Sequence, residues 1–259
     1  MSDRIKDYWD SQAVKHGTSH NASWGDNWMI DLEISTITKY IHPNDCVLDV
    51  GCANGYSTFR QLEKCNLKNI TGIDFSSKMI QEANANKKNM KIDGKINFNE
   101  GDIRSLVFED NSFDLVYTTR VLINLPSWEE QIDGIQECIR VTKPGGTIIL
   151  SEGFWEPLCF LNSIRMLAGL SPLVEHDFNR YLKLEVLKNF LAKMNLKYKI
   201  DDFSSVYYLG SRFLRELVTD TSKYEGFSNP INKTFFEIQK NYSGGGFGIQ
   251  QAIIIEKKF

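Results

Sequence analysis

Residues 45–55, Asp-Cys-Val-Leu-Asp-Val-Gly-Cys-Ala-Asn-Gly, combine residue types that can bind a nucleotide-like ligand. An apolar run from Cys46 to Val50 leads into a turn, and a helix-compatible segment from Tyr56 to Lys64 follows it. Strand, glycine-rich turn and helix form the opening unit of nucleotide-binding α/β domains. Small residues are needed in the turn because a Cβ atom would keep the backbone away from the ligand.

The spacing within this turn separates two kinds of ligand. A dinucleotide-binding loop has the pattern G-x-G-x-x-G, and its third glycine would fall at Tyr56. The pattern D-x-G-x-G-x-G fits instead, with Ala53 at the middle glycine, and here the chain resembles the class I S-adenosylmethionine (SAM) methyltransferases. Residues 69–74 form a short strand that ends in the carboxylate of Asp74, which can accept hydrogen bonds from both hydroxyls of a ribose.

The resemblance implies SAM as the cofactor, S-adenosylhomocysteine as its product, and roles for the matching residues. Asp49 would meet the amino group of the methionine moiety, and Asp74 would hold the ribose. Phe75 and Met79 would flank the adenine, and Asp102 would accept from the adenine amino group. The complete expected cofactor site consists of Asp49, Gly51, Cys52, Ala53, Gly55, Asp74, Phe75, Ser76, Met79, Asp102, Ile103, Arg120, Tyr8 and Trp9.

Glu152 and His176 are the candidate general bases, with His16 or His20 as alternatives. Glu152 follows the predicted strand 147–150, at the sheet edge where ligands bind in open α/β sheets. His176 lies in a polar turn further along the chain. Arginines beside that histidine favour a phosphate or carboxylate on the acceptor. The expected acceptor site consists of Arg120, Asn124, Arg165, Asn179, Arg180 and Tyr181, and a solvated charged surface is the alternative interpretation.

Residues 1–28 are unusually aromatic, since they hold Tyr8 and three of the five tryptophans, Trp9, Trp24 and Trp28. The hypothesis is that this segment forms a helical lid over the cofactor, where aromatic faces attract the sulfonium cation and exclude water. Docking of an N-terminal helix for stability alone is the alternative.

Alternating strand and helix patterns through residue 150 predict a parallel, doubly wound α/β sheet. Strands are expected at 46–50, 69–73, 96–98, 113–117 and 147–150. Ser76 is expected to cap a helix, and isoleucine stripes predict helices over 30–41 and 128–139.

The second half of the chain departs from this alternation. Residues 151–195 contain helical patterns at 156–168 and 183–194 and are interpreted as a helical, acceptor-binding insertion after strand 5. Residues 196–208 are strand-like, 211–220 and 230–241 helical, and 247–255 a last, antiparallel strand. The resemblance implies one Rossmann-like domain over 1–259, with seven mostly parallel strands in the order 3-2-1-4-5-7-6 and helices on both faces.

Composition narrows the classes of partner. The chain has 259 residues and a formal net charge of −3, which disfavours a nucleic-acid substrate. No apolar run approaches the roughly 20 residues of a membrane helix, and no signal-peptide core begins the sequence. Five cysteines without a C-x-x-C indicate reduced thiols and a cytoplasmic protein. No metal site is expected, because His16 and His20 lack a third ligand.

The expected activity is metal-independent transfer of the SAM methyl group to an oxygen of a small polar metabolite. A sugar, a sugar nucleotide or a capsule phosphoramidate precursor is the first hypothesis, which places the chain in polysaccharide biosynthesis. N-methylation of an amino sugar or natural product, RNA or protein methylation, an inactive binding subunit and a nicotinamide oxidoreductase are the alternatives. Asn124-Leu-Pro-Ser127 is interpreted as a chance match to nucleic-acid methylases, because Ser127 replaces their aromatic residue. The chain is expected to be a monomer or a homodimer.

Overall fold

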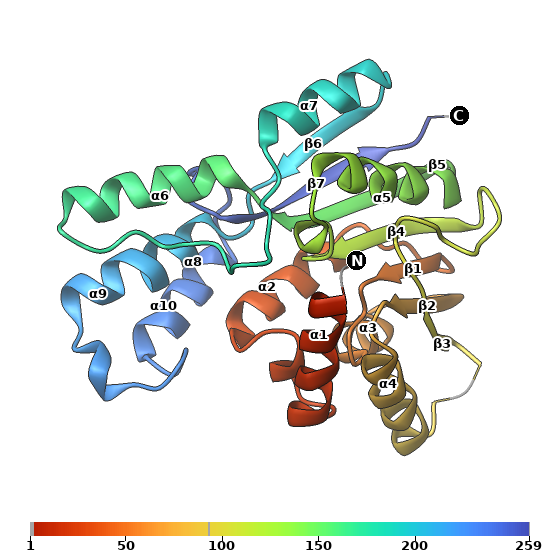
Figure 1. Ribbon diagram of the computed structural model, residues 1–259, viewed down its shortest axis with the longest axis horizontal. Helices are drawn as coiled ribbons and strands as arrows, with labels where there is room; N and C mark the ends of the chain where they lie inside the picture. The colour runs from red at the N-terminus through yellow and green to blue at the C-terminus, as the bar shows by residue number, and fades with distance from the viewer. Residues whose placement is uncertain (1–2, 93, 259) are drawn as a thin grey trace.

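The computed structural model describes residues 3–92 and 94–258, which form a seven-stranded sheet in the order β3-β2-β1-β4-β5-β7-β6 (Figure 1). The four pairings among β1 to β5 are parallel, and β7 runs antiparallel to both β5 and β6. The predicted strand order and the antiparallel last strand are therefore confirmed. The strands are β1 (Cys46–Val50), β2 (Asn69–Asp74), β3 (Ile96–Glu100), β4 (Phe113–Thr119), β5 (Thr142–Gly153), β6 (Lys197–Asp201) and β7 (Gln250–Glu256).

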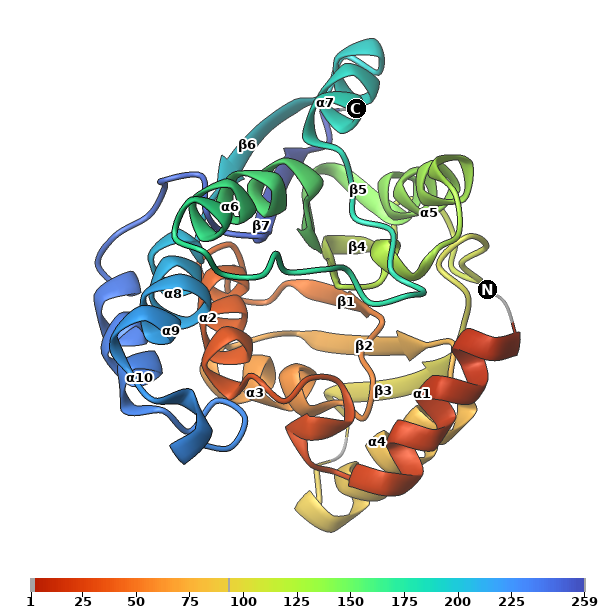
Figure 2. The ribbon, with the colours of Figure 1, turned by 60° about the vertical axis from the view of Figure 1, so that its left-hand side comes forward.

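Helices cover both faces of this sheet (Figure 2). The longer ones are α1 (Asp3–His16), α2 (Asn27–Thr38), α3 (Tyr56–Lys64), α4 (Ser77–Met90), α5 (Trp128–Val141), α6 (Trp155–Leu167), α7 (Leu184–Lys193) and α10 (Pro230–Gln239). Short helical segments are η1 (His20–Ala22), η2 (Leu122–Asn124), α8 (Ser205–Leu209), the π-helix η3 (Gly210–Leu214), α9 (Arg215–Val218) and η4 (Thr221–Lys223). Ser76 caps α4 as predicted, because its hydroxyl accepts from the Met79 amide at 3.0 Å. Across the described ranges, no helix combines the length and apolarity required to cross a membrane.

Alternation along the strands builds a core on each face of the sheet. Val47 of β1 packs into the cluster that includes α2, α3 and α10, whereas its neighbour Leu48 packs into the cluster that includes α5 and α7. Successive side chains of a strand point to opposite faces, so a central strand buried on both sides is apolar throughout. The ligand-binding residues are therefore left to the turns that follow the strands.

The strand prediction for 196–208 is wrong in its second half. β6 ends at Asp201, and the chain turns because the Asp202 carboxylate accepts from the amide of Gly246 at 2.9 Å. Helix α8 then begins at Ser205, and η3 and α9 follow it without a break. The sequence pattern missed this turn because its anchor lies 44 residues away along the chain.

The N-terminal segment lies against the edge of the sheet that holds β3, where α1 packs along α4 (Figure 2). Asn54 of the loop after β1 fixes this segment, since its amide nitrogen donates to the carbonyls of Gly17 and Ser19, each at 2.7 Å. The part of the N-terminal segment around Gly17 and Ser19 thereby reaches the glycine-rich turn that the sequence singled out.

Candidate functional site

A cavity lies at the carboxyl ends of β1, β2 and β4, where open α/β sheets bind their ligands. We call it the first cavity. Its lining residues are Trp9, Ser23, Asp49, Val50, Gly51, Cys52, Ala53, Asn54, Tyr56, Ser57, Ile73, Asp74, Phe75, Met79, Gly101, Ile103, Thr119, Arg120, Val121 and Asn124. Most of the expected cofactor site is thus brought together in one place.

Gly51 and Gly55 shape the turn that lines the first cavity. Gly51 has φ +77°, and a Cβ atom there would lie 1.9 Å from Cγ2 of Val121. Gly55 has φ +79°, and its Cβ atom would lie 2.7 Å from the ring of Phe98. Both positions therefore require glycine, for backbone conformation and for space. Ala53 between them also has a positive φ, of 48°.

Asp49 is almost fully buried beneath this turn. Its Oδ2 accepts from the Thr58 hydroxyl at 2.6 Å, whereas its Oδ1 has no hydrogen-bond partner among the described residues. Burial raises the pKa of Asp49 to about 7, and the hydrogen bond from Thr58 opposes that rise. An unpartnered buried carboxylate oxygen costs free energy, so this side chain suits a ligand that donates to it.

Asp74 at the end of β2 connects the glycine-rich turn after β1 to the start of α4. Its Oδ2 accepts from the Ala53 amide at 2.9 Å and its Oδ1 from the Ser76 amide at 2.8 Å. Burial raises the pKa of Asp74 to about 6, against the lowering effect of these backbone hydrogen bonds. Each carboxylate oxygen can accept a second hydrogen bond, so Asp74 retains capacity for a ligand.

Four of the expected cofactor residues, Gly55, Ser76, Asp102 and Tyr8, do not line the first cavity. Asp102 is paired with Arg104, whose Nε lies 3.0 Å from Oδ1, and this ion pair lowers the pKa of Asp102 although partial burial opposes it. Ser76 instead caps α4 and donates to Asp10 of α1. Tyr8 lines a second, adjoining cavity. The expected direct contact of Asp102 with an adenine is therefore corrected: its neighbours Gly101 and Ile103 line the cavity instead.

The second cavity adjoins the first and shares Trp9, Ser23, Arg120 and Asn124 with it. Six aromatic residues dominate its lining, together with amides and small residues. The lining residues are Tyr8, Trp9, Ser23, Trp24, Arg120, Ile123, Asn124, Gly153, His176, Phe178, Asn179, Tyr181, Tyr208, Ile249 and Gln250. Each cavity encloses about 830 Å³ of free space, open mouth included. Sequence reasoning missed Phe178, Tyr208 and Gln250, because no local pattern shows that the segment 176–181, α8 and the start of β7 meet at this site.

His176, Asn179 and Tyr181 line the second cavity, as expected from the sequence. The imidazole of His176 packs in a tilted arrangement against Phe178 with ring centroids 4.1 Å apart, and its Nδ1 lies 2.8 Å from Asp177. With Nδ1 engaged by a carboxylate, Nε2 of the neutral ring is an acceptor. His176 therefore has the environment of a proton acceptor at the edge of this cavity.

Glu152 lines neither cavity, which corrects its expected role as a base. It is fully buried, and its Oε1 accepts from the Thr118 hydroxyl at 2.7 Å and from the amides of Val121 and Leu122 at 3.1 and 3.2 Å. Burial raises the pKa of Glu152 to about 7, and these hydrogen bonds oppose the rise. Its structural role is to hold the loop that carries Arg120 and Asn124.

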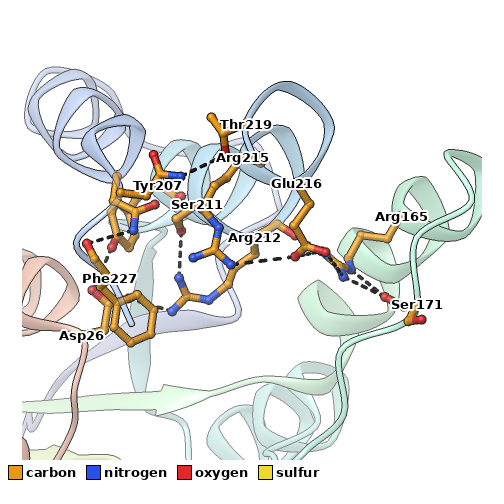
Figure 3. Close-up of polar contacts among 12 residues, drawn as sticks. Asp26, Arg165, Ser171, Tyr207, Ser211, Arg212, Arg215, Glu216, Thr219 and Phe227 are labelled. Atoms are coloured by element: carbon orange, nitrogen blue, oxygen red, sulfur yellow. Dashed lines mark hydrogen bonds and ion pairs between the residues drawn. The ribbon is translucent and has the colours of Figure 1, made fainter. Parts of the chain in front are cut away.

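Arg165 and Arg180 also lie outside both cavities, which corrects their assignment to the acceptor site. Arg165 is buried in α6, where it pairs with Glu216 at 2.9 Å and donates to the Ser171 carbonyl (Figure 3). The Arg180 side chain is exposed, and its backbone makes the contacts: the amide donates to the Ile123 carbonyl at 2.7 Å, and the carbonyl accepts from Gln131 at 2.9 Å. The arginines that suggested an anionic acceptor therefore connect structural elements.

A buried polar network centred on Glu33 lies behind the junction of the two cavities. Glu33 of α2 accepts from Arg120 at 2.9 Å, from the Ser151 hydroxyl at 2.7 Å and from the amide of Gln250. The guanidinium of Arg120 also lies over the ring of Trp24, 4.6 Å from its centroid. The signal for Glu33 was an acidic residue within the apolar stripe of α2, where burial requires a partner.

The aromatic N-terminal segment reaches the site in part. Trp9 lines both cavities and Tyr8 and Trp24 line the second, whereas Trp28 packs against Phe236 with ring centroids 4.8 Å apart. The indole nitrogen of Trp9 donates to Oδ1 of Asn124 at 2.9 Å, which links α1 to the loop after β4. Three of the four aromatic residues are thus placed where a lid would need them.

Comparison with known proteins agrees with this geometry. Residues 47–146 match the family model described as a methyltransferase domain. A sterol 24-C-methyltransferase of Kluyveromyces lactis is 35% identical over 113 residues, which are 43% of this chain and 29% of that protein. The 27-O-demethylrifamycin SV methyltransferase of Amycolatopsis mediterranei is 31% identical over 113 residues, 43% of this chain and 40% of its own length. The matched part thus spans less than half of each of these relatives.

A solved structure extends the likeness to nearly the whole chain. The geranyl diphosphate C-methyltransferase of Streptomyces coelicolor has a TM-score of 0.63 at 14% identity, covering 99% of this chain and 98% of its own. At this identity the likeness shows that the fold is shared and leaves the reaction to the residues of the site.

Proposed function

The chain belongs, through residues 47–146, to the class I SAM-dependent methyltransferases, and on this premise we propose that it transfers a methyl group from SAM to a small acceptor. The cofactor would occupy the first cavity and the acceptor the second. The observation that carries the proposal is that the two cavities meet, at Trp9, Ser23, Arg120 and Asn124. Methyl transfer requires a donor and an acceptor aligned in contact, and most of its acceleration comes from that alignment.

The residues of the first cavity fit such a cofactor. Asp49 offers an unpartnered carboxylate oxygen to an ammonium group, and Asp74 has remaining acceptor capacity for ribose hydroxyls. Phe75, Met79 and Ile103 offer the apolar contacts that an adenine needs. When bound, SAM supplies a methyl group already activated by its sulfonium. The protein then has to orient the acceptor, exclude water and receive a proton.

The acceptor atom that we propose is an oxygen. The relatives named above include both C- and O-methylating enzymes, so the proposal rests on His176, whose Nε2 is free to take the hydroxyl proton while Asp177 holds Nδ1. The phosphate or carboxylate first expected on the acceptor loses its support, because Arg165 and Arg180 lie elsewhere. A sugar nucleotide and a place in polysaccharide biosynthesis lose theirs with it.

Residues 1–28 remain a proposed lid and 151–195 a proposed acceptor-binding segment of one domain. Trp9 belongs to the first segment and His176 to the second, and both line the second cavity. Lid closure would exclude water from the sulfonium, which strengthens every electrostatic contact inside.

Calorimetric titration with S-adenosylhomocysteine tests the cofactor part. Asp74→Ala is expected to weaken binding roughly tenfold or more, because hydrogen bonds to an ionised group are lost. Asp133→Asn, an exposed position on α5, is the control and is expected to bind like the parent protein. Absence of binding by the parent protein would refute the proposal.

Radiolabelled SAM with a panel of hydroxylated small molecules then tests methyl transfer, and His176→Gln is expected to lower turnover with unchanged cofactor affinity.

A further inference from the structure

The orientation of the Asn124 amide is fixed by Trp9 of α1. The indole nitrogen of Trp9 can only donate, so the group of Asn124 that faces it at 2.9 Å is the carbonyl oxygen. The amide nitrogen of Asn124 then points to Asn179, where it donates to Oδ1 at 3.0 Å. Asn179 in turn must present its carbonyl to Asn124 and its amide nitrogen away from it.

This relay leaves a donor in the second cavity. Asn179 lines that cavity, and its Nδ2 has no hydrogen-bond partner among the described residues. Three side chains, each orienting the next, therefore place a hydrogen-bond donor in the lining of the second cavity. Trp9 fixes Asn124, Asn124 fixes Asn179, and Asn179 offers an N–H.

A second relay leaves an acceptor in the same cavity. Glu33 accepts from Arg120 at one oxygen and from Ser151 at the other, so its carboxylate takes the amide nitrogen of Gln250 rather than the carbonyl. The same nitrogen lies 3.3 Å from the Ser151 hydroxyl. Gln250 lines the second cavity, and its Oε1 has no partner among the described residues.

The charges at this cavity are already compensated. Arg120 is paired with Glu33 at 2.9 Å, and its free face covers Trp24. His176, which is a cation only when protonated, lies 2.8 Å from Asp177, and Asp177 also contacts Arg4. Among the described lining residues no cation is left without a counter-charge. An anionic acceptor would therefore lose its hydration without gaining an ion pair.

We infer that the second cavity selects an uncharged acceptor with a flat apolar body that donates a hydrogen bond to Oε1 of Gln250 and accepts one from Nδ2 of Asn179. The inference rests on the proposed function and specifies its substrate class as hydroxylated aromatic or conjugated carbonyl compounds. The aromatic side chains that line the cavity contact the flat body of the acceptor. Oε1 of Gln250 accepts from its hydroxyl, and Nδ2 of Asn179 donates to its carbonyl. Gln250 and Asn179 are thereby specificity-determining residues, and Glu33 and Trp9 are positioning residues.

Three simple arenes test this inference as probes. 4′-Hydroxyacetophenone has the hydroxyl and the carbonyl, 4′-methoxyacetophenone lacks the donor, and 4-hydroxybenzoate carries a negative charge. Binding is measured by ligand-observed NMR on the full chain saturated with S-adenosylhomocysteine, after calorimetry has shown that this cofactor product binds. Failure at the calorimetric step refutes the proposed function, whereas failure at the probe step refutes only the substrate class.

Two variants assign the contacts. Asn179→Asp keeps an oxygen that accepts from Asn124 but replaces the donor, and it is expected to weaken 4′-hydroxyacetophenone roughly fivefold to tenfold. Gln250→Met keeps the length of the side chain and removes the acceptor, and it is expected to abolish the preference for hydroxyl over methoxy. Asn241→Asp at an exposed position is the matched control and is expected to leave all three affinities unchanged.

The expected order of affinity is the hydroxyketone above both the methoxy compound and the benzoate. Tighter binding of the benzoate, equal binding of the three probes, or no detectable binding of any would overturn the inference. So would unchanged selectivity in both variants. Circular dichroism and cofactor affinity of each variant separate a lost contact from a lost fold.

Discussion

Asp26 and Arg212, 186 residues apart in the chain, form a buried ion pair with 2.6 Å between Oδ2 and Nη2 (Figure 3). Asp26 also caps α2 by accepting from the Met29 amide, and its Oδ1 accepts from the Tyr207 hydroxyl at 2.7 Å. Arg212 lies between the rings of Phe227 and Tyr208, and Tyr208 lines the second cavity. The pair thus joins the N-terminal segment to the helices that follow β6, behind the proposed acceptor site.

Breaking this pair on one side is expected to destabilise the protein strongly. Arg212→Met leaves the carboxylate of Asp26 buried with one charged partner fewer, at a cost of about 3–5 kcal/mol in the free energy of unfolding. Urea denaturation measures it. Lys240→Met, which removes an exposed pair with Glu237, is expected to cost under about 1 kcal/mol. The double variant Asp26→Asn, Arg212→Met should recover part of the loss, and a loss equal to the sum of the singles would contradict the pairing.

Gly51→Ala is expected to lose cofactor binding and stability, because the new Cβ atom would lie 1.9 Å from Cγ2 of Val121. Adding Val121→Ala removes that methyl group and should restore part of the stability. The positive φ of +77° keeps about 1 kcal/mol of strain in the double variant. Thermal unfolding and titration with S-adenosylhomocysteine measure both effects. No recovery in the double variant would show that backbone strain, and not the contact, dominates.

Glu152→Gln is expected to affect stability rather than proton transfer. The amide nitrogen of the glutamine would meet backbone N–H groups of the loop after β4, so at least one buried donor loses its acceptor, at about 1–3 kcal/mol. Urea denaturation gives the stability, and the pH profile of turnover gives the role. A profile that loses an ionisation in this variant would restore Glu152 as a base.

The stability of the cofactor-free protein is expected to fall as pH rises from about 4 to about 7. The pKa of Asp49 is raised to about 7 and that of Asp74 to about 6, chiefly by burial, so in this range the folded state binds more protons than the unfolded state. The stabilising contribution is complete below the unfolded pKa values and is lost as each folded pKa is passed. Thermal melts between pH 5 and 8 measure it, with Asp49→Asn expected to flatten the curve.

Cofactor affinity is expected to change in the opposite direction. Ammonium and hydroxyl groups donate to the ionised carboxylates, so binding of S-adenosylhomocysteine should strengthen as pH rises through the pKa values of Asp74 and Asp49. Calorimetry in buffers of different ionisation enthalpy should record proton release at pH 6. Proton uptake, or affinity independent of pH, would contradict the assignment of these two residues.

The sequence by itself determined the first cavity. Asp49, Gly51, Gly55 and Asp74 lie next to the strands that place them, and a strand followed by a tight turn needs these residue types locally. Periodicity predicted the alternation of strands and helices, the family resemblance implied the strand order, and a serine before a helical pattern predicted the cap at Ser76. Local chemistry and local geometry sufficed because the residues involved are neighbours in the chain or lie at the ends of adjacent strands.

The tertiary structure alone decided the second cavity. Its wall is assembled from α1, the loop after β4, the segment 176–181, α8 and the start of β7, which no local pattern relates. Burial also overturned two roles that the residue types suggested, a general base for Glu152 and an acceptor-binding residue for Arg165. Both side chains lie near the site but form hydrogen bonds with other parts of the protein. A charged group removed from water must find partners, and only the folded chain determines whether those partners are a ligand or its own backbone.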